Sequence, residues 1–158
     1  MHFALRFIRV EVLLCLLFLI VASPAWPRIT TVVIDRIESP TFEGQAFGDV
    51  GRYKKIVGRM FGAVDPKTAE HANIVNLDKA SQNAIGLVEY STDFYILKPF
   101  DSTKGNRTLF SAILNRGSKI DFILLHDVPF GKRTNDATTA ADAGNGFLMR
   151  QGYTIVWT

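Results

Sequence analysis

The segment Asn115-Arg116-Gly117-Ser118-Lys119 holds the residue types best suited to chemistry in this sequence. It directly follows the apolar run 109–114, which predicts a buried strand. In open α/β sheets, ligands bind beyond the carboxyl ends of the strands. A loop with glycine at that place can present backbone N–H groups to a developing oxyanion. Arg116 and Gly117 are therefore candidate catalytic residues on the oxyanion side. The alternative, which the local sequence favours, is a strand-terminating turn with a solvated arginine and lysine.

The residues that such a loop would need as partners are not evident. Ser118 is not flanked by the Gly-x-Ser-x-Gly pattern, and this pattern occurs nowhere in the chain. A serine nucleophile on a strand-to-helix elbow is therefore not encoded here. His126 and Asp127 are adjacent, whereas a catalytic base and its orienting carboxylate usually meet across the fold. We interpret His126 as a loop residue, and we expect His71, in the polar stretch 68–73, to be solvated.

Neither a metal site nor a cofactor site is predicted. Cys15 is the only cysteine. After residue 25 the chain has two scattered histidines, His71 and His126, and no cysteine, which argues against zinc. Gly144-Asn145-Gly146 could bind an anion at a helix N-terminus. It lacks the third glycine of the dinucleotide fingerprint, so helix entry and close packing are the favoured role. Glu89, Asp93 and Asp142 are the carboxylates nearest to structured segments, and none has an evident partner for acid–base catalysis.

The first 25 residues have the pattern of an export signal. Arg6 and Arg9 precede the apolar run 12–22, and Ser23-Pro24-Ala25 supplies the small residues that a signal peptidase recognises. A membrane-spanning helix needs about 20 apolar residues, and this run is shorter. We therefore expect residues 1–25 to be a signal peptide and the protein to be exported, periplasmic or secreted, with no stable membrane span after cleavage. The alternative is a membrane anchor formed by an uncleaved N-terminal segment.

The rest of the chain, 26–158, is expected to form a single domain rich in β-structure. Val, Ile, Thr and aromatic residues are concentrated in segments bounded by Gly, Pro and Asp. The predicted strands are 29–38, 53–64, 74–77, 88–97, 109–114 and 153–158. Helix signals cover 136–151, where Gly152 occupies the position of a helix-terminating glycine. The first strands favour antiparallel pairs, and the final 50 residues predict a βαβ unit.

Composition excludes several classes of protein. Apolar residues make up 47% of the chain and 12 residues are Phe, which indicates a folded protein. The formal net charge is +3, and the basic residues are spread along the sequence. No basic stripe interleaved with aromatic residues is present, so nucleic acid is not an expected partner.

Several stretches resemble the exported bacterial proteins that carry an α/β-hydrolase domain with a distinctive N-terminal half. The resemblance covers nearly all of the chain after the signal, with the motifs in order. The matching stretches are Phe47-Gly48, Gly51-x-Tyr53, Val57-Gly58-Arg59, Gly62-Ala63-Val64-Asp65-Pro66, Asn83-Ala84-x-Gly86, the run from Val88 to Pro99, Asn115-Arg116-Gly117 and the run from Asp142 to Trp157.

The resemblance implies the N-terminal portion of an α/β-hydrolase fold, with antiparallel strands leading into a βαβ unit of a mostly parallel, incomplete sheet. It implies a parent enzyme that hydrolyses small ester-like or other acyl substrates. In that fold the nucleophile, acid and histidine follow the fourth strand, which here corresponds to 153–158. The chain itself is therefore expected to lack a complete active site and to be inactive. The alternative is an exported, non-catalytic, β-rich module that binds a ligand.

Overall fold

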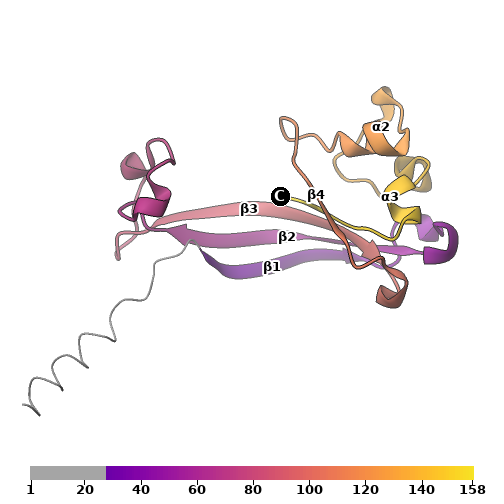
Figure 1. Cartoon of the computed structure of the whole chain (residues 1–158), viewed down its shortest axis with the longest axis horizontal. Coiled ribbons are helices and arrows are strands. Elements are labelled where there is room, and N and C mark those ends of the chain that lie inside the picture. The colour runs from indigo at the N-terminus through magenta and orange to yellow at the C-terminus, as the bar shows by residue number, and fades with distance from the viewer. Residues whose placement is uncertain (1–27) are drawn as a thin grey trace, which may run out of the picture. The chain divides into compact units, whose positions relative to one another are not determined.

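A computed structural model of the chain describes residues 28–158. They form one five-stranded sheet with the strand order β1-β2-β3-β5-β4 (Figure 1). The strands are β1 (Arg28–Glu38), β2 (Tyr53–Val64), β3 (Val88–Pro99), β4 (Leu109–Ala112) and β5 (Thr154–Trp157). Two short α-helices, α2 (Asp121–His126) and α3 (Phe147–Arg150), lie in the connection from β4 to β5.

The chain divides into two compact units. Residues 29–62 and 90–158 form the larger unit, which contains most of the sheet and both helices. Residues 63–89 belong to the smaller unit, where 3-10 helices span Ala69–His71 and Leu77–Lys79. The strand predicted at 74–77 is wrong, because Asn76 adopts a left-handed conformation there and starts a turn. His71 is also buried and not solvated: its Nδ1 lies 2.7 Å from Thr68 Oγ1 and 2.7 Å from Asp65 O.

The pairing of β2 with β3 depends on glycine. A Cβ on Gly58 would lie 2.6 Å from the Phe94 ring, and one on Gly62 would lie 2.4 Å from the Tyr90 ring. Each ring therefore occupies the space above a glycine of the neighbouring strand. From Gly58 to Gly62 the chain advances four residues along β2, whereas their partners go back four residues along β3, from Phe94 to Tyr90, as antiparallel strands require. The arrows of β2 and β3 in Figure 1 accordingly point in opposite directions. The glycines spaced four apart thus mark a close approach of aromatic side chains.

The α/β-hydrolase fold predicted from the resemblance is wrong. β5 pairs in parallel with β4, from Leu109 with Thr154 to Ala112 with Trp157, but antiparallel with β3. The sheet is therefore mixed and not mostly parallel. Within residues 28–158 only α2 and α3 are α-helices, with six and four residues respectively. The described chain is a β-rich fold in which long strands, and not helices, supply most of the structure.

The helix predicted over 136–151 fails for a local reason. Thr139 and Asp142 form a capping box that closes a single 3-10 turn, Ala140–Ala143. Gly144 and Gly146 then have φ of 57° and 66°, a conformation that ends a right-handed helix. Only Phe147–Arg150 remains as α3, and Gly152 (φ 79°) turns the chain into β5. The sequence thus contains one 3-10 turn and one short α-helix, separated by Gly144 and Gly146, where it predicts a single helix.

The core of the larger unit is built from aromatic side chains on the face of the sheet that carries α2 and α3. Trp157 of β5 stacks on Phe122 at 5.5 Å and meets the Tyr95 ring edge-on at 5.3 Å. Its Nε1 donates a 2.9 Å hydrogen bond to Asp121 Oδ2, which satisfies the buried indole. Tyr53 donates its hydroxyl to Met149 O and Tyr153 O, and so joins β2 to the segment before β5.

Candidate ligand pocket

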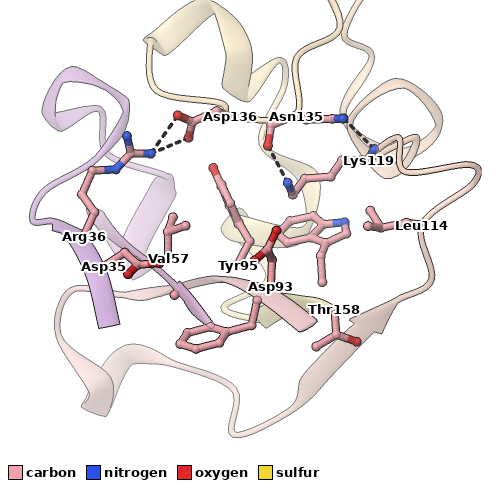
Figure 2. Close-up of a pocket in the computed structure, with 13 residues that line it drawn as sticks. Asp35, Arg36, Val57, Asp93, Tyr95, Leu114, Lys119, Asn135, Asp136 and Thr158 are labelled. Atoms are coloured by element: carbon pink, nitrogen blue, oxygen red, sulfur yellow. Dashed lines mark hydrogen bonds and ion pairs between the residues drawn. The ribbon is translucent and has the colours of Figure 1, made fainter. Parts of the chain in front are cut away.

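A pocket of about 360 Å³ lies over β1, β2, β3 and β5 in the larger unit (Figure 2). The strands supply one side of it. The segments after β4 and before α3 supply the other. Its lining residues are Asp35, Arg36, Val57, Gly58, Asp93, Phe94, Tyr95, Leu114, Lys119, Asn135, Asp136, Trp157 and Thr158. The pocket thus combines aromatic walls with a small number of charged groups, which is the usual composition of a small-molecule site.

Lys119 is the buried cation of this pocket, with 9% of its surface exposed. Its ammonium group donates a short hydrogen bond to the backbone carbonyl of Asn135. It also lies 4.2 Å from the centroid of the Tyr95 ring and 5.8 Å from that of Trp157. These are cation–π distances. Among the ion pairs of residues 28–158, none includes Lys119.

The surroundings of Lys119 disfavour its charge. Burial lowers the pKa of its ammonium group; the nearby carboxylate of Asp136 opposes this shift, and the charge of Lys55 adds to it. Burial also raises the pKa of Tyr95, whose hydroxyl donates to Ala137 O at 3.0 Å. Tyr95 is therefore a neutral phenol that contributes the face of its ring to the pocket. An anion close to Lys119 would favour its charged form and so oppose this lowering of the pKa.

Lys55 is the second buried lysine, and it is fully enclosed. Its ammonium lies 2.7 Å from Glu38 Oε2 and 2.9 Å from Asp136 Oδ1, and it donates to Ala137 O at 3.1 Å. Arg36 binds the same Asp136 carboxylate at 2.7 Å and Glu38 at 3.2 Å. Burial would raise the pKa of Asp136, but hydrogen bonds from Lys55 and Arg36 keep that pKa below its usual value. The two cations and two carboxylates balance one another.

Asn135 and Asp136 hold the segment that faces the strands across the pocket (Figure 2). The Asn135 side chain accepts a hydrogen bond from Lys119 N and donates one to Gly117 O at 2.7 Å. Asp136 joins the same segment to β1 and β2 through Arg36 and Lys55. Residues far apart in the sequence therefore fix both ends of the pocket.

The predicted oxyanion residues lie beside this pocket and do not line it. Arg116 and Gly117 occupy the tip of a turn closed by the bridge between Asn115 and Ser118. Both are exposed and both have positive φ, 53° and 77°. The residues that flank the turn, Leu114 and Lys119, are the ones that enter the pocket.

The other candidates from the sequence are separated. His126 is not a loop residue but ends α2, where it is buried beside Phe122 and its Nδ1 lies 3.4 Å from Ala143 O. Asp127 accepts a hydrogen bond from the Asn145 side chain. Asp142 caps its own turn, where it accepts from the backbone of Thr138 and Thr139.

The remaining predictions have mixed outcomes. Gly144-Asn145-Gly146 serves close packing, since a Cβ on Gly144 would lie 1.9 Å from His126 O. Glu89 accepts a hydrogen bond from Asn83 within the smaller unit. Of the three carboxylates considered, only Asp93 lines the pocket. The predicted signal peptide, residues 1–25, lies outside the described residues.

Comparisons add no family to this geometry. No protein-family model, curated protein or solved structure matches this chain. Within residues 28–158 no group of three or more His, Cys, Asp or Glu side chains is placed to hold a metal ion. The same residues contain no helix with the length and apolar character to cross a membrane.

Reasoning from sequence missed Lys119, Lys55 and Asp136. Lys119 was considered only as part of a solvated turn, and the other two were not considered as site residues. One signal was available: Lys55 alternates with Tyr53 and Val57, and so shares their face of a strand. A lysine at an inward position requires a buried partner.

Proposed function

We propose that this chain binds a small anionic molecule that carries an apolar or aromatic part. The observation that supports this most directly is the buried ammonium group of Lys119, which borders a pocket and has no carboxylate partner among residues 28–158. A buried charge is costly unless it is paired. The chain neutralises Lys55 with its own carboxylates, whereas at Lys119 an anionic ligand can take that role.

The walls of the pocket define the rest of the ligand. Tyr95, Trp157, Val57 and Leu114 supply apolar and aromatic surface around Lys119. The volume of about 360 Å³ lies near the lower end of the usual range for small-molecule sites. A compact carboxylate with a ring or a short branched chain fits both features, because its charge can reach Lys119 while its apolar part contacts the aromatic rings.

Asp93 provides a control for which the expected change in ligand affinity has the opposite sign. Its carboxylate lines the same pocket, and it has no ion-pair partner among residues 28–158. A negative charge at this place opposes the entry of an anion. Removal of the Asp93 charge should therefore strengthen binding of a carboxylate, whereas removal of the Lys119 charge should weaken it.

The experiment measures binding by calorimetry and by thermal shift with matched pairs of probes. Benzoate, phenylacetate and hexanoate are compared with benzamide, phenylacetamide and hexanamide. We expect the carboxylates to bind and the amides to bind at least tenfold more weakly, since a hydrogen bond to a charged group contributes about 1.5–3 kcal/mol. Equal binding of both series would contradict the proposal.

Three variants assign the effect to the pocket. Lys119→Met should lower carboxylate affinity at least tenfold, and Asp93→Asn should raise it. Lys104→Met removes an exposed lysine that does not line the pocket and should leave carboxylate affinity unchanged. Unchanged affinity in Lys119→Met, with the protein folded by circular dichroism, would place the ligand elsewhere.

Hydrolysis of small esters by a parent enzyme, with this chain itself inactive, remains a prediction that the resemblance implies. The backbone N–H groups of Arg116 and Gly117 donate no hydrogen bond within residues 28–158, and both residues face solvent. The full chain is assayed with short-chain p-nitrophenyl esters. Turnover above the buffer rate that is lost in Gly117→Pro would support an oxyanion role for this turn. Binding without turnover would favour the non-catalytic module.

A further inference from the structure

The outer edge of the sheet at β1 is a second surface with no assigned role. β1 is the first strand in the sheet order, and among the strands of residues 28–158 it pairs only with β2 (Figure 1). Ten of its eleven residues are exposed. Five of these exposed side chains are large and apolar: Ile29, Val32, Val33, Ile34 and Ile37. Strand edges of this length and character usually pair with another chain unless they are protected.

The common protections of an edge strand are missing from β1. The strand contains no proline and no lysine, and Pro40 comes only after it ends. Three of its four charged residues, Asp35, Arg36 and Glu38, form ion pairs with Arg59, Asp136 and Lys55, and the fourth, Arg28, is its first residue.

We infer that β1 pairs antiparallel with β1 of a second copy of this chain, across a two-fold axis at Val33. In an antiparallel pair, the numbers of two residues that lie opposite each other always add up to the same sum. A two-fold axis perpendicular to the sheet keeps each side chain on its own face, and opposite residues share a face, so this sum must be even. A sum of 66 uses the whole strand. It sets Val33 against Val33, Val32 against Ile34 and Ile29 against Ile37 of the second copy.

Charge selects the same register. With Val33 on the axis, Arg28 faces Glu38, Thr30 faces Arg36 and Thr31 faces Asp35 of the second copy, so no like charges meet. A shift of the axis to Val32 places Arg28 against Arg36, and a shift to Asp35 places this carboxylate against itself. A shift to Ile34 brings no like charges together, but it loses the pair of Arg28 with Glu38 and sets Arg36 against Val32 and Asp35 against Val33. Like charges directly opposite are destabilising. Of the four registers compared, only the one with Val33 on the axis combines a pair of opposite charges with the absence of like-charge pairs.

The first test measures the mass of the full chain by analytical ultracentrifugation at 5–100 µM. We expect a dimer that Val33→Lys and Val33→Glu each convert to a monomer, because each variant places like charges on the axis. An equimolar mixture of the two variants should dimerise again. Ile113→Lys, at an apolar residue with 90% of its surface exposed, is the matched control and should stay dimeric.

The second test fixes the register with single cysteines in a Cys15→Ser background. Val33→Cys should be joined by a short thiol cross-linker, since residues directly opposite have Cβ atoms about 4.5–5.5 Å apart. Ile29→Cys alone should not be joined, but a mixture of Ile29→Cys and Ile37→Cys should. A monomer at 100 µM, higher assemblies in place of a dimer, or cross-linking of Ile29→Cys alone would overturn the inference. So would failure of the Val33→Cys cross-link.

Discussion

Lys55 and Lys119 are both buried beside the Tyr95 ring, yet their surroundings differ. Lys55 lies 5.6 Å from the ring centroid and meets two carboxylates and a carbonyl. Lys119 lies 4.2 Å from the same centroid and meets one carbonyl and two aromatic faces. One lysine is therefore neutralised within the fold, and the other is left facing a pocket. The comparison separates a cation that supports structure from one that is available to a ligand.

The difference follows from position in the fold. Lys55 projects from the middle of the sheet, where Glu38 of β1 and Asp136 reach it from two directions. Lys119 comes from the connection after β4 and extends over the end of β5, where the rings of Trp157 and Tyr95 lie beside its ammonium group and no carboxylate of residues 28–158 forms an ion pair with it. Aromatic faces attract a cation more weakly than a carboxylate does. The ammonium group of Lys119 can therefore still bind a carboxylate from a ligand.

The largest expected effect is the loss of the neutralised lysine. Lys55→Met leaves Glu38 and Asp136 with only Arg36, and we expect the free energy of unfolding to fall by about 2–3 kcal/mol. Both carboxylates keep some contact with water, which limits the loss. Urea denaturation of the variant and the wild type measures the difference. A loss no greater than that of Lys119→Met would remove the distinction between the two lysines.

The next effect is the contribution of Lys119 to the dependence of stability on pH. Since its pKa is lowered in the fold, the unfolded chain binds the additional proton between that pKa and the usual value near 10.5. Stability should therefore rise with pH in this window, by at most about 1.4 kcal/mol per unit, and should be flat below it. The difference in unfolding free energy between the wild type and Lys119→Met, followed from pH 7 to 10, isolates this slope. A bound carboxylate should abolish it.

A smaller effect is expected from Lys119→Met at neutral pH in the absence of ligand. Replacement of a buried charge by an apolar side chain of similar length is often neutral or stabilising. We expect the free energy of unfolding to stay the same or to rise by about 1 kcal/mol. The Asn135 carbonyl, which loses its hydrogen bond from Lys119, limits this rise. Thermal and urea unfolding measure it. A loss above about 2 kcal/mol would show that Lys119, like Lys55, is a structural ion.

The smallest effect concerns His126, a buried base that, like Lys119, has no ion pair among residues 28–158. Burial lowers its pKa, although the Ala143 carbonyl and the charges of Asp121 and Asp127 oppose the shift. The unfolded chain therefore takes up a proton first as the pH falls below about 6.5, and stability should decrease by less than about 1 kcal/mol at pH 5.5. His126→Leu should lack this decrease. A variant that parallels the wild type from pH 7 to 5.5 would assign the titration to another group.

The sequence predicts the long strands well, because their signals are local. β2 has the predicted bounds, 53–64, and β1 differs by one residue. The short strands and the helices depend on glycine conformation, so the expected helix over 136–151 became one 3-10 turn and one turn of α-helix. The short helix α2 was not predicted, since 120–126 is an apolar run without caps.

The pocket could not be predicted from the sequence, because the residues that form it lie far apart along the chain. The ion pair between Lys55 and Asp136 joins residues 81 positions apart, and the bond between Lys119 and Asn135 depends on where that same segment lies. No periodicity or spacing encodes such contacts. The composition of the turn predicts a site at Arg116 and Gly117. The neighbouring Lys119 is the residue that the fold buries in the pocket.

The attachment of the Asp136 segment has a consequence for the rate at which a bound molecule dissociates from the pocket. The segment opposite the strands is fastened by the Asp136 carboxylate to Arg36, whose side chain is 47% exposed, as well as to enclosed Lys55. Dissolved ions screen the first attachment far more than the second. Release of a bound molecule should therefore accelerate as salt is added, well before the protein loses its folded state.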